Sequence, residues 1–144
     1  MPWIKPFIAL LFLSAGCSPE TNEGTQACSK EQALVAENSV GRIDSWLDLE
    51  RFFETHASCD DGLIAEGLSD RVGILLERDL DQFLIITRVA SKREFRQFVI
   101  KHLDESLNEE TLHSILRLTR NCPRGDREVC ERLRVRTEGA LNAL

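Results

Sequence analysis

The stretch from residue 62 to residue 78 reads GLIAEGLSDRVGILLER and decides the fold. Five of its large apolar residues recur mainly at spacings of three and four, the spacing of one buried face of a helix. They are Ile64, Leu68, Val72, Leu75 and Leu76. Asp60 or Asp61 directly precedes the stretch, and an aspartate at that position can cap the first turn. The pattern therefore predicts an amphipathic helix over residues 62–78.

Two features of this predicted helix are unusual. Arg71 falls on the apolar stripe, and a partly buried arginine needs a carboxylate partner. The candidates for that partner are Asp48, Asp60 and Asp61. Gly67 flanks the stripe, and we expect its missing side chain to let a neighbouring backbone come close.

Further helices are predicted on both sides of this one. Apolar periodicity marks them over residues 28–38, 43–56, 91–103, 106–120 and 126–138. Ser91 with Glu94 and Ser106 with Glu109 have the spacing of capping boxes, and Asp126 is placed to cap the last helix. Residues 80–90 are rich in β-branched residues, but no second strand-like run could pair with them, so we expect a buried helix there too. The predicted fold is all-α: a compact antiparallel bundle of about six helices.

Four cysteines lie within these helical segments or at their ends: Cys28, Cys59, Cys122 and Cys130. An even number is typical of disulfides in an oxidising compartment, and four cysteines allow three pairings. We favour Cys28–Cys59 and Cys122–Cys130, because each pair joins sequence neighbours across one helical hairpin. A zinc site is the alternative, but no C-x-x-C pair with a two-histidine partner pattern is present.

The first residues have the features of a secretory signal. Lys5 supplies a positive charge, an apolar run covers residues 7–13, and the small residues Ala15 and Gly16 follow. A membrane-spanning helix needs about 20 apolar residues, so this run is too short to be one. The alternatives that remain are an ordinary cleaved signal and the signal of a lipoprotein.

The stretch Leu13-Ser14-Ala15-Gly16-Cys17 resembles the lipobox of bacterial lipoproteins. In that family the cysteine carries a diacylglycerol and becomes the first mature residue, which would make Cys17 a lipid anchor. The resemblance divides the chain into a signal peptide (1–16), a lipidated tether (17–27) and a single helical domain (28–144). Ser14 stands where the family usually has leucine. Ser18 is not the aspartate that holds such proteins at the inner membrane, so the resemblance implies the outer membrane, facing the periplasm.

The charge of the chain is unevenly distributed. The formal net charge is −6, but residues 17–116 carry 10 Lys and Arg against 20 Asp and Glu. Residues 117–144 carry 7 Arg against 4 acidic residues. A mostly acidic body argues against a nucleic-acid binder, which needs a basic face. It is compatible with a basic protein partner that is attracted electrostatically.

The sequence offers little for catalysis or for cofactor binding. No G-x-S-x-G motif is present, and the histidines His56, His102 and His113 are isolated in the sequence. Glu105-Ser106 resembles the Glu-Ser pair of lytic transglycosylases, but the resemblance covers two residues only. Four acidic residues at one helix start (Asp60, Asp61, Glu66 and Asp70) could hold calcium, yet the alternating pattern of an EF-hand loop is absent. We expect a non-enzyme without a metal or a cofactor.

Size, anchor, disulfides and acidic body are similar in general character to those of immunity lipoproteins, which neutralise toxins delivered into the periplasm. This resemblance contains no motif. It favours an inhibitor of a secreted toxin, with the partner face at Asp60, Asp61, Glu66, Asp70 and Arg71. The alternative is a scaffold lipoprotein that docks on an outer-membrane or cell-wall complex, and a cell-wall hydrolase comes third.

Overall fold

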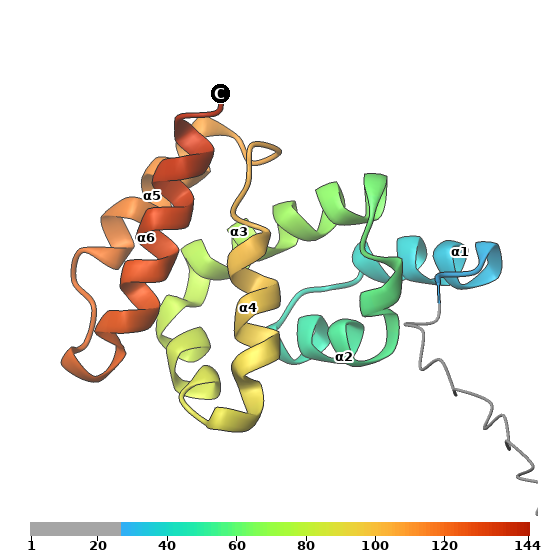
Figure 1. Cartoon of the computed structure of the whole chain (residues 1–144), viewed down its shortest axis with the longest axis horizontal. Helices are drawn as coiled ribbons and strands as arrows, with labels where there is room; N and C mark the ends of the chain where they lie inside the picture. The colour runs from blue at the N-terminus through green and yellow to red at the C-terminus, as the bar shows by residue number, and fades with distance from the viewer. Residues whose placement is uncertain (1–26) are drawn as a thin grey trace, which may run out of the picture.

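The computed structural model describes residues 27–144, which form six α-helices, three short 3-10 helices and no strand (Figure 1). The α-helices are α1 (Lys30–Val40), α2 (Trp46–His56), α3 (Gly62–Thr87), α4 (Arg93–Lys101), α5 (Glu109–Thr119) and α6 (Arg127–Leu141). The 3-10 helices are η1 (Ala57–Cys59), η2 (Ala90–Lys92) and η3 (Arg124–Asp126). The prediction of an all-α bundle of about six helices is confirmed. The predicted signal, Cys17 and most of the tether lie outside the described residues.

Helix α3 is the centre of the structure. Figure 1 shows α1 and α2 on one side of it and the adjacent pair α5 and α6 on the other, with α4 between the two groups. The five predicted apolar residues of its first half are buried, together with Phe83 and Leu84 of its second half. The core is continued by fully buried side chains of the other helices and by Leu103, which follows α4; those of the helices are Leu49, Leu112, Ile115 and Leu133. None of the helices in residues 27–144 is long and apolar enough to cross a membrane.

A kink divides α3 at Asp79, where the backbone adopts φ −155° and ψ 64°. The two helices predicted over 62–78 and 80–90 are thus both present, but they meet at one non-helical residue and the second ends at Thr87. The indole Nε1 of Trp46 donates to the Asp79 carbonyl oxygen at 2.9 Å. The Asp79 carboxylate accepts from the Gln82 amide at 3.0 Å and so caps the second half. These two hydrogen bonds satisfy backbone groups that the kink exposes.

The helix starts differ from the prediction in several places. Helix α2 begins at Trp46 rather than at residue 43, because Ser45 caps it by accepting from the Asp48 amide. Asn108 caps α5, accepting from the Thr111 amide at 2.9 Å, so the predicted capping box at Ser106 is wrong. The Ser106 hydroxyl donates to Asp104 instead.

The caps predicted at Ser91 and Asp126 are also wrong, whereas the cap predicted at Asp60 or Asp61 is present at Asp61. Ser91 lies in the 3-10 helix η2, and Lys92 takes the cap position of α4 without a side-chain hydrogen bond. Asp126 stands at the cap position of α6 but makes no capping hydrogen bond, because its carboxylate is bonded to Arg88. At Asp126 a tertiary ion pair thus takes the place of the local cap.

Both favoured disulfides are present. Cys28–Cys59 ties the start of α1 to η1 with a Cα–Cα distance of 4.9 Å. Cys122–Cys130 ties the α5–α6 connection to α6 with a Cα–Cα distance of 6.3 Å. Both distances lie within the range of about 4.4–6.8 Å that a disulfide requires, so the structure confirms the predicted pairing.

The two interior glycines of α3 make room for side chains rather than for a backbone, contrary to the prediction for Gly67. A Cβ built on Gly67 would lie 2.9 Å from Val40 Cγ1. A Cβ built on Gly73 would lie 2.9 Å from Leu107 Cδ2 and 3.0 Å from Thr111 Cγ2. Val40 and Leu107 are themselves buried, so neither can move away easily.

Replacing Gly73 by alanine is expected to lower the free energy of unfolding by about 1 kcal/mol. The gain in helix propensity is about 1 kcal/mol, but an added methyl group in a well-packed site costs about 1–3 kcal/mol. Gly139→Ala in α6 is the matched control, because its Cβ would meet nothing within 4 Å and only the gain in propensity remains. Urea unfolding of both variants checks the difference, and a stabilised Gly73→Ala variant would contradict the close packing of α3.

Candidate functional site

The five residues predicted to form the partner face do not all lie on one surface. The Asp60 side chain is only 2 % exposed, forms an ion pair with Lys101 and lies 3.2 Å from His102 Nε2. It therefore cannot contribute to an exposed face, and this part of the prediction is wrong. Asp61 is exposed and caps α3, accepting from the Gly62 amide at 2.8 Å; Gly62 has a φ of 53°, which favours glycine.

Four exposed side chains in the first half of α3 follow one stripe, which we name the outer face of α3: Leu63, Glu66, Asp70 and Ile74. Spacings of three, four and four residues keep them on one side of the helix. The two apolar members remain well exposed, Leu63 at 76 % and Ile74 at 47 %. Glu66 and Asp70 make no ion pair or side-chain hydrogen bond with any residue of 27–144. The outer face thus combines free carboxylates with accessible apolar area.

Arg71 lies beside the outer face and is half-buried. Its Nη2 donates to the Gly41 carbonyl oxygen at 3.3 Å, so the predicted carboxylate partner is wrong. Together with Asp70 and Ile74 it borders a shallow pocket of about 290 Å³ between the end of α1, the middle of α3 and the segment before α5. A partner that covers the outer face would meet this pocket at its edge.

A buried polar network lies on the inner side of α3. The Ser69 hydroxyl is 3.1 Å from His102 Nδ1 and donates to Asp104 Oδ2 at 3.0 Å. His102 Nε2 is 3.2 Å from Asp60 Oδ2, and Lys101 forms an ion pair with the same carboxylate. The network joins the segment before α3, the middle of α3 and the end of α4.

The network sets the ionisation of Asp60. Burial alone would raise the pKa of the Asp60 carboxyl, because it disfavours the charged form. The polar contacts and charges of His102 and Lys101 outweigh burial and hold the pKa of Asp60 below its usual value of 3.8. Asp60 is therefore a carboxylate at neutral pH, and its charge is used inside the fold.

Ser69, His102 and Asp60 are the residue types of a Ser-His-Asp triad, but their position is unsuited to nucleophilic catalysis. Ser69 is 0 % exposed and His102 1 % exposed, so a substrate could not reach the hydroxyl. The same hydroxyl lies 3.1 Å from the Ala65 carbonyl oxygen, within its own helix. His102 is thus a buried residue within hydrogen-bond distance of Ser69. We conclude that the network positions secondary structure.

A second buried carboxylate has a similar role. Asp126 is 2 % exposed in its side chain, and Arg88 Nε and Nη2 donate to its two oxygens at 3.0 and 2.8 Å. The hydrogen bonds from Arg88 lower the pKa of Asp126 despite its burial. The pair fastens the end of α3 to the start of α6.

The described residues offer no group of three or more His, Cys, Asp or Glu side chains that could hold a metal ion. The acidic residues considered for calcium point to different places, Asp60 into the core and Glu66 and Asp70 to solvent. The four cysteines of the described residues are used in disulfides.

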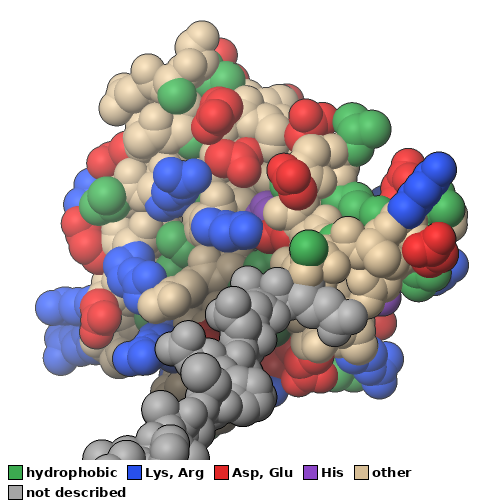
Figure 2. Space-filling model, turned by 45° about the vertical axis from the view of Figure 1, so that its right-hand side comes forward, with side chains coloured by type: hydrophobic (Ala, Val, Ile, Leu, Met, Phe, Trp, Pro, Cys, Tyr) green, Lys and Arg blue, Asp and Glu red, His purple; other side chains and the backbone are tan. Residues whose placement is uncertain are grey.

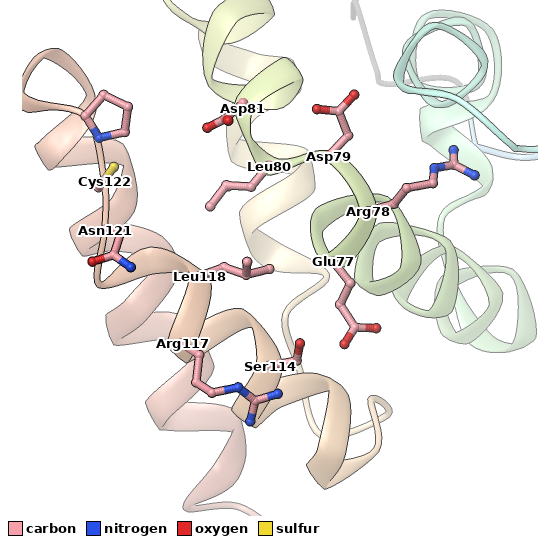
Figure 3. A pocket seen from close by; sticks show the side chains of 11 residues that line it. Glu77, Arg78, Asp79, Leu80, Asp81, Ser114, Arg117, Leu118, Asn121 and Cys122 are labelled. Carbon is pink, nitrogen blue, oxygen red and sulfur yellow. The ribbon is translucent and has the colours of Figure 1, made fainter.

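A polar cleft of about 430 Å³ lies where α3 bends (Figure 3). One wall consists of α3 residues 77–81, and the other consists of α5 and the loop that follows it. Leu80 and Leu118 lie between the two walls in Figure 3, and charged side chains surround them. We name it the kink cleft.

Sequence reasoning missed the buried network and the kink cleft. The partners in the network are separated by 33 to 42 positions, so no local pattern connects them. The cleft had one weak signal in the sequence, the charged segment Glu77-Arg78-Asp79-Leu80-Asp81. This segment lies where the apolar periodicity of one predicted helix ends and that of the next begins.

No family model, curated protein or solved structure matches the chain.

Proposed function

We propose that the protein is a lipid-anchored binding protein of the cell envelope, held by Cys17 at the outer membrane and facing the periplasm. Its partner is a protein, and the role that we favour is that of an immunity protein or inhibitor that neutralises a secreted toxin. The outer face of α3 is the single observation that carries this proposal.

The outer face has the composition of a protein-binding surface. Leu63 and Ile74 offer apolar area that binding could desolvate, while Glu66 and Asp70 offer unpaired negative charge. Figure 2 shows, on one side of the molecule, that acidic and basic side chains are interspersed and that apolar side chains form small separate areas. Steering by charge, with a few apolar anchors, is therefore the mode of association that the surface supports.

The frame beneath this face is well suited to rigid binding. Cys28–Cys59 fastens the segment next to the start of α3, and the buried network fastens its middle to α4. A preorganised surface loses less conformational entropy on binding than a mobile one. The burial of Ser69 and His102 argues in addition that the polar residues most similar to a catalytic set serve the fold.

Reversing the charges of the outer face is expected to slow partner association about tenfold at low salt. In the first step, the mature protein, expressed from the full-length sequence, is used to capture its partner from secreted and envelope fractions. It then measures association rates of the purified partner with the wild type and with the double variant Glu66→Lys/Asp70→Lys by surface plasmon resonance. Raising the salt concentration should reduce the difference, because salt screens exposed charges.

Glu94→Lys/Glu128→Lys is the matched control, since it changes the net charge equally at exposed positions of α4 and α6. Equal association rates for both double variants would contradict the assignment of the face. A captured toxin that loses activity in a one-to-one complex would support the inhibitor. Resident envelope proteins as the specific partners would instead favour the scaffold lipoprotein.

A further inference from the structure

The kink cleft has features that the proposed protein partner does not use. Asp81 from α3 lies at one end of it, and Ser114 and Arg117 from α5 lie at the other, with two leucines between them (Figure 3). Its volume of about 430 Å³ falls within the range of about 300–1,000 Å³ that is usual for small-ligand sites. It is therefore large enough for a small molecule with an apolar body.

The charges at the two ends are not satisfied by the protein itself. Asp81 and Arg117 are exposed and form no ion pair with any residue of 27–144. Their neighbours in the cleft are used differently, because Arg78 pairs with Asp44 at 3.0 Å and Asp79 accepts from the Gln82 amide. The cleft thus presents one available carboxylate and one available guanidinium on opposite walls.

We propose that the kink cleft binds a short zwitterionic peptide. The ammonium of the peptide lies at Asp81, its carboxylate lies at Arg117 with Ser114 as a further donor, and its apolar side chain covers Leu80 and Leu118. A guanidinium binds a carboxylate in a bidentate manner that an ammonium or a neutral group cannot reproduce. This proposal goes beyond the proposed inhibitor and does not depend on it.

Contacts within the fold set the shape of the cleft. The bend of α3 at Asp79 brings the walls of the cleft into position, and the hydrogen bond from Trp46 stabilises this bend. Trp46 is itself buried and packs against Phe83, with ring centroids 5.0 Å apart. A preformed site avoids the cost of ordering the protein on binding. A ligand as small as a dipeptide in so open a site should bind with a dissociation constant on the order of 1 mM.

The probe is the dipeptide Ala-Leu. It is titrated into the ¹⁵N-labelled mature protein, expressed from the full-length sequence, and binding is followed by the amide chemical shifts. We expect saturable shifts at Leu80, Asp81 and Leu118. N-acetyl-Ala-Leu, which lacks the ammonium, and Ala-Leu-amide, which lacks the carboxylate, should each bind at least tenfold more weakly. Equal binding of the blocked peptides, or no saturable shift, would overturn the proposal.

Single substitutions test the contact at each end of the kink cleft separately. Arg117→Gln should make Ala-Leu and Ala-Leu-amide bind equally, and Asp81→Asn should do the same for Ala-Leu and its acetylated form. Glu77 lines the same cleft, so Glu77→Gln should strengthen binding by removing a charge that repels the carboxylate of the peptide. Arg120→Gln is the control, because Arg120 is exposed and does not line the kink cleft; loss of binding in that variant as large as in Arg117→Gln would contradict the orientation.

Discussion

Replacing Cys28 and Cys59 together by alanine is expected to lower the free energy of unfolding by about 3.7 kcal/mol at 25 °C. The two cysteines are 31 positions apart in the chain, and a disulfide restricts the unfolded chain more strongly when it closes a longer loop. The loss would be a large part of the total stability of a single domain, which is about 5–15 kcal/mol. Urea unfolding monitored by far-UV circular dichroism measures it directly.

The second disulfide supplies a matched control inside the same molecule. Cys122 and Cys130 are 8 positions apart, so the same relation gives about 2.5 kcal/mol for their replacement by alanine. Packing is comparable, since each bridge has one buried cysteine (Cys59 and Cys130, both 3 % exposed) and one half-buried cysteine. A larger loss for Cys122–Cys130 than for Cys28–Cys59 would contradict the loop-entropy explanation and indicate that native packing dominates.

The features that sequence alone predicted well are those that depend on near neighbours. The apolar period of residues 62–78 placed five residues in the core, and all five are buried. Glu66 and Asp70, which lie outside this apolar stripe, are exposed. Helical geometry fixes the direction of a side chain once the helix is identified, so these statements needed no tertiary information.

Features set by distant partners could not be predicted in this way. Arg71 lies at the angle of the apolar stripe, yet its partner is the Gly41 carbonyl oxygen, 30 positions away, rather than a carboxylate. Asp126 has the position of a helix cap but bonds to Arg88, 38 positions away. In each case the polar side chain binds a partner that the fold brings to it rather than the one that the sequence suggested.

Asp60 shows why the candidate site was only partly predictable. It lies between η1 and α3, where no period assigns an inward or an outward direction, whereas its neighbour Asp61 is fixed outward by its role as a cap. Two adjacent aspartates therefore have opposite environments. The side chain of Asp60 is 2 % exposed and Asp61 belongs to the exposed residues, and this difference provides a direct test of the buried network.

Asp60→Asn is expected to lower the free energy of unfolding at pH 7 by about 1–3 kcal/mol, because buried polar groups of the network lose their charged partner. Asp61→Asn, the same substitution one position later, should change it by less than about 0.5 kcal/mol, since asparagine caps a helix as well as aspartate does. Urea unfolding of the two variants gives the comparison. A similar effect of both substitutions would contradict the electrostatic role of the buried carboxylate.

The pH dependence of the free energy of unfolding, compared between wild type and Asp60→Asn, gives a second test of the buried network. Because the pKa of Asp60 is lower in the folded protein than its usual value of 3.8, the unfolded chain takes up the proton first as the solution is acidified. The contribution of Asp60 to stability is thus fully present above about pH 4 and is lost as the pH falls through the lowered pKa of the folded state. The difference in stability between wild type and Asp60→Asn should therefore shrink below pH 3.8. Other acids with lowered pKa values, such as Asp48 and Asp126, affect both proteins equally and cancel in this difference. If the difference in the free energy of unfolding stays constant or widens on acidification, Asp60 is not held as a carboxylate by His102 and Lys101.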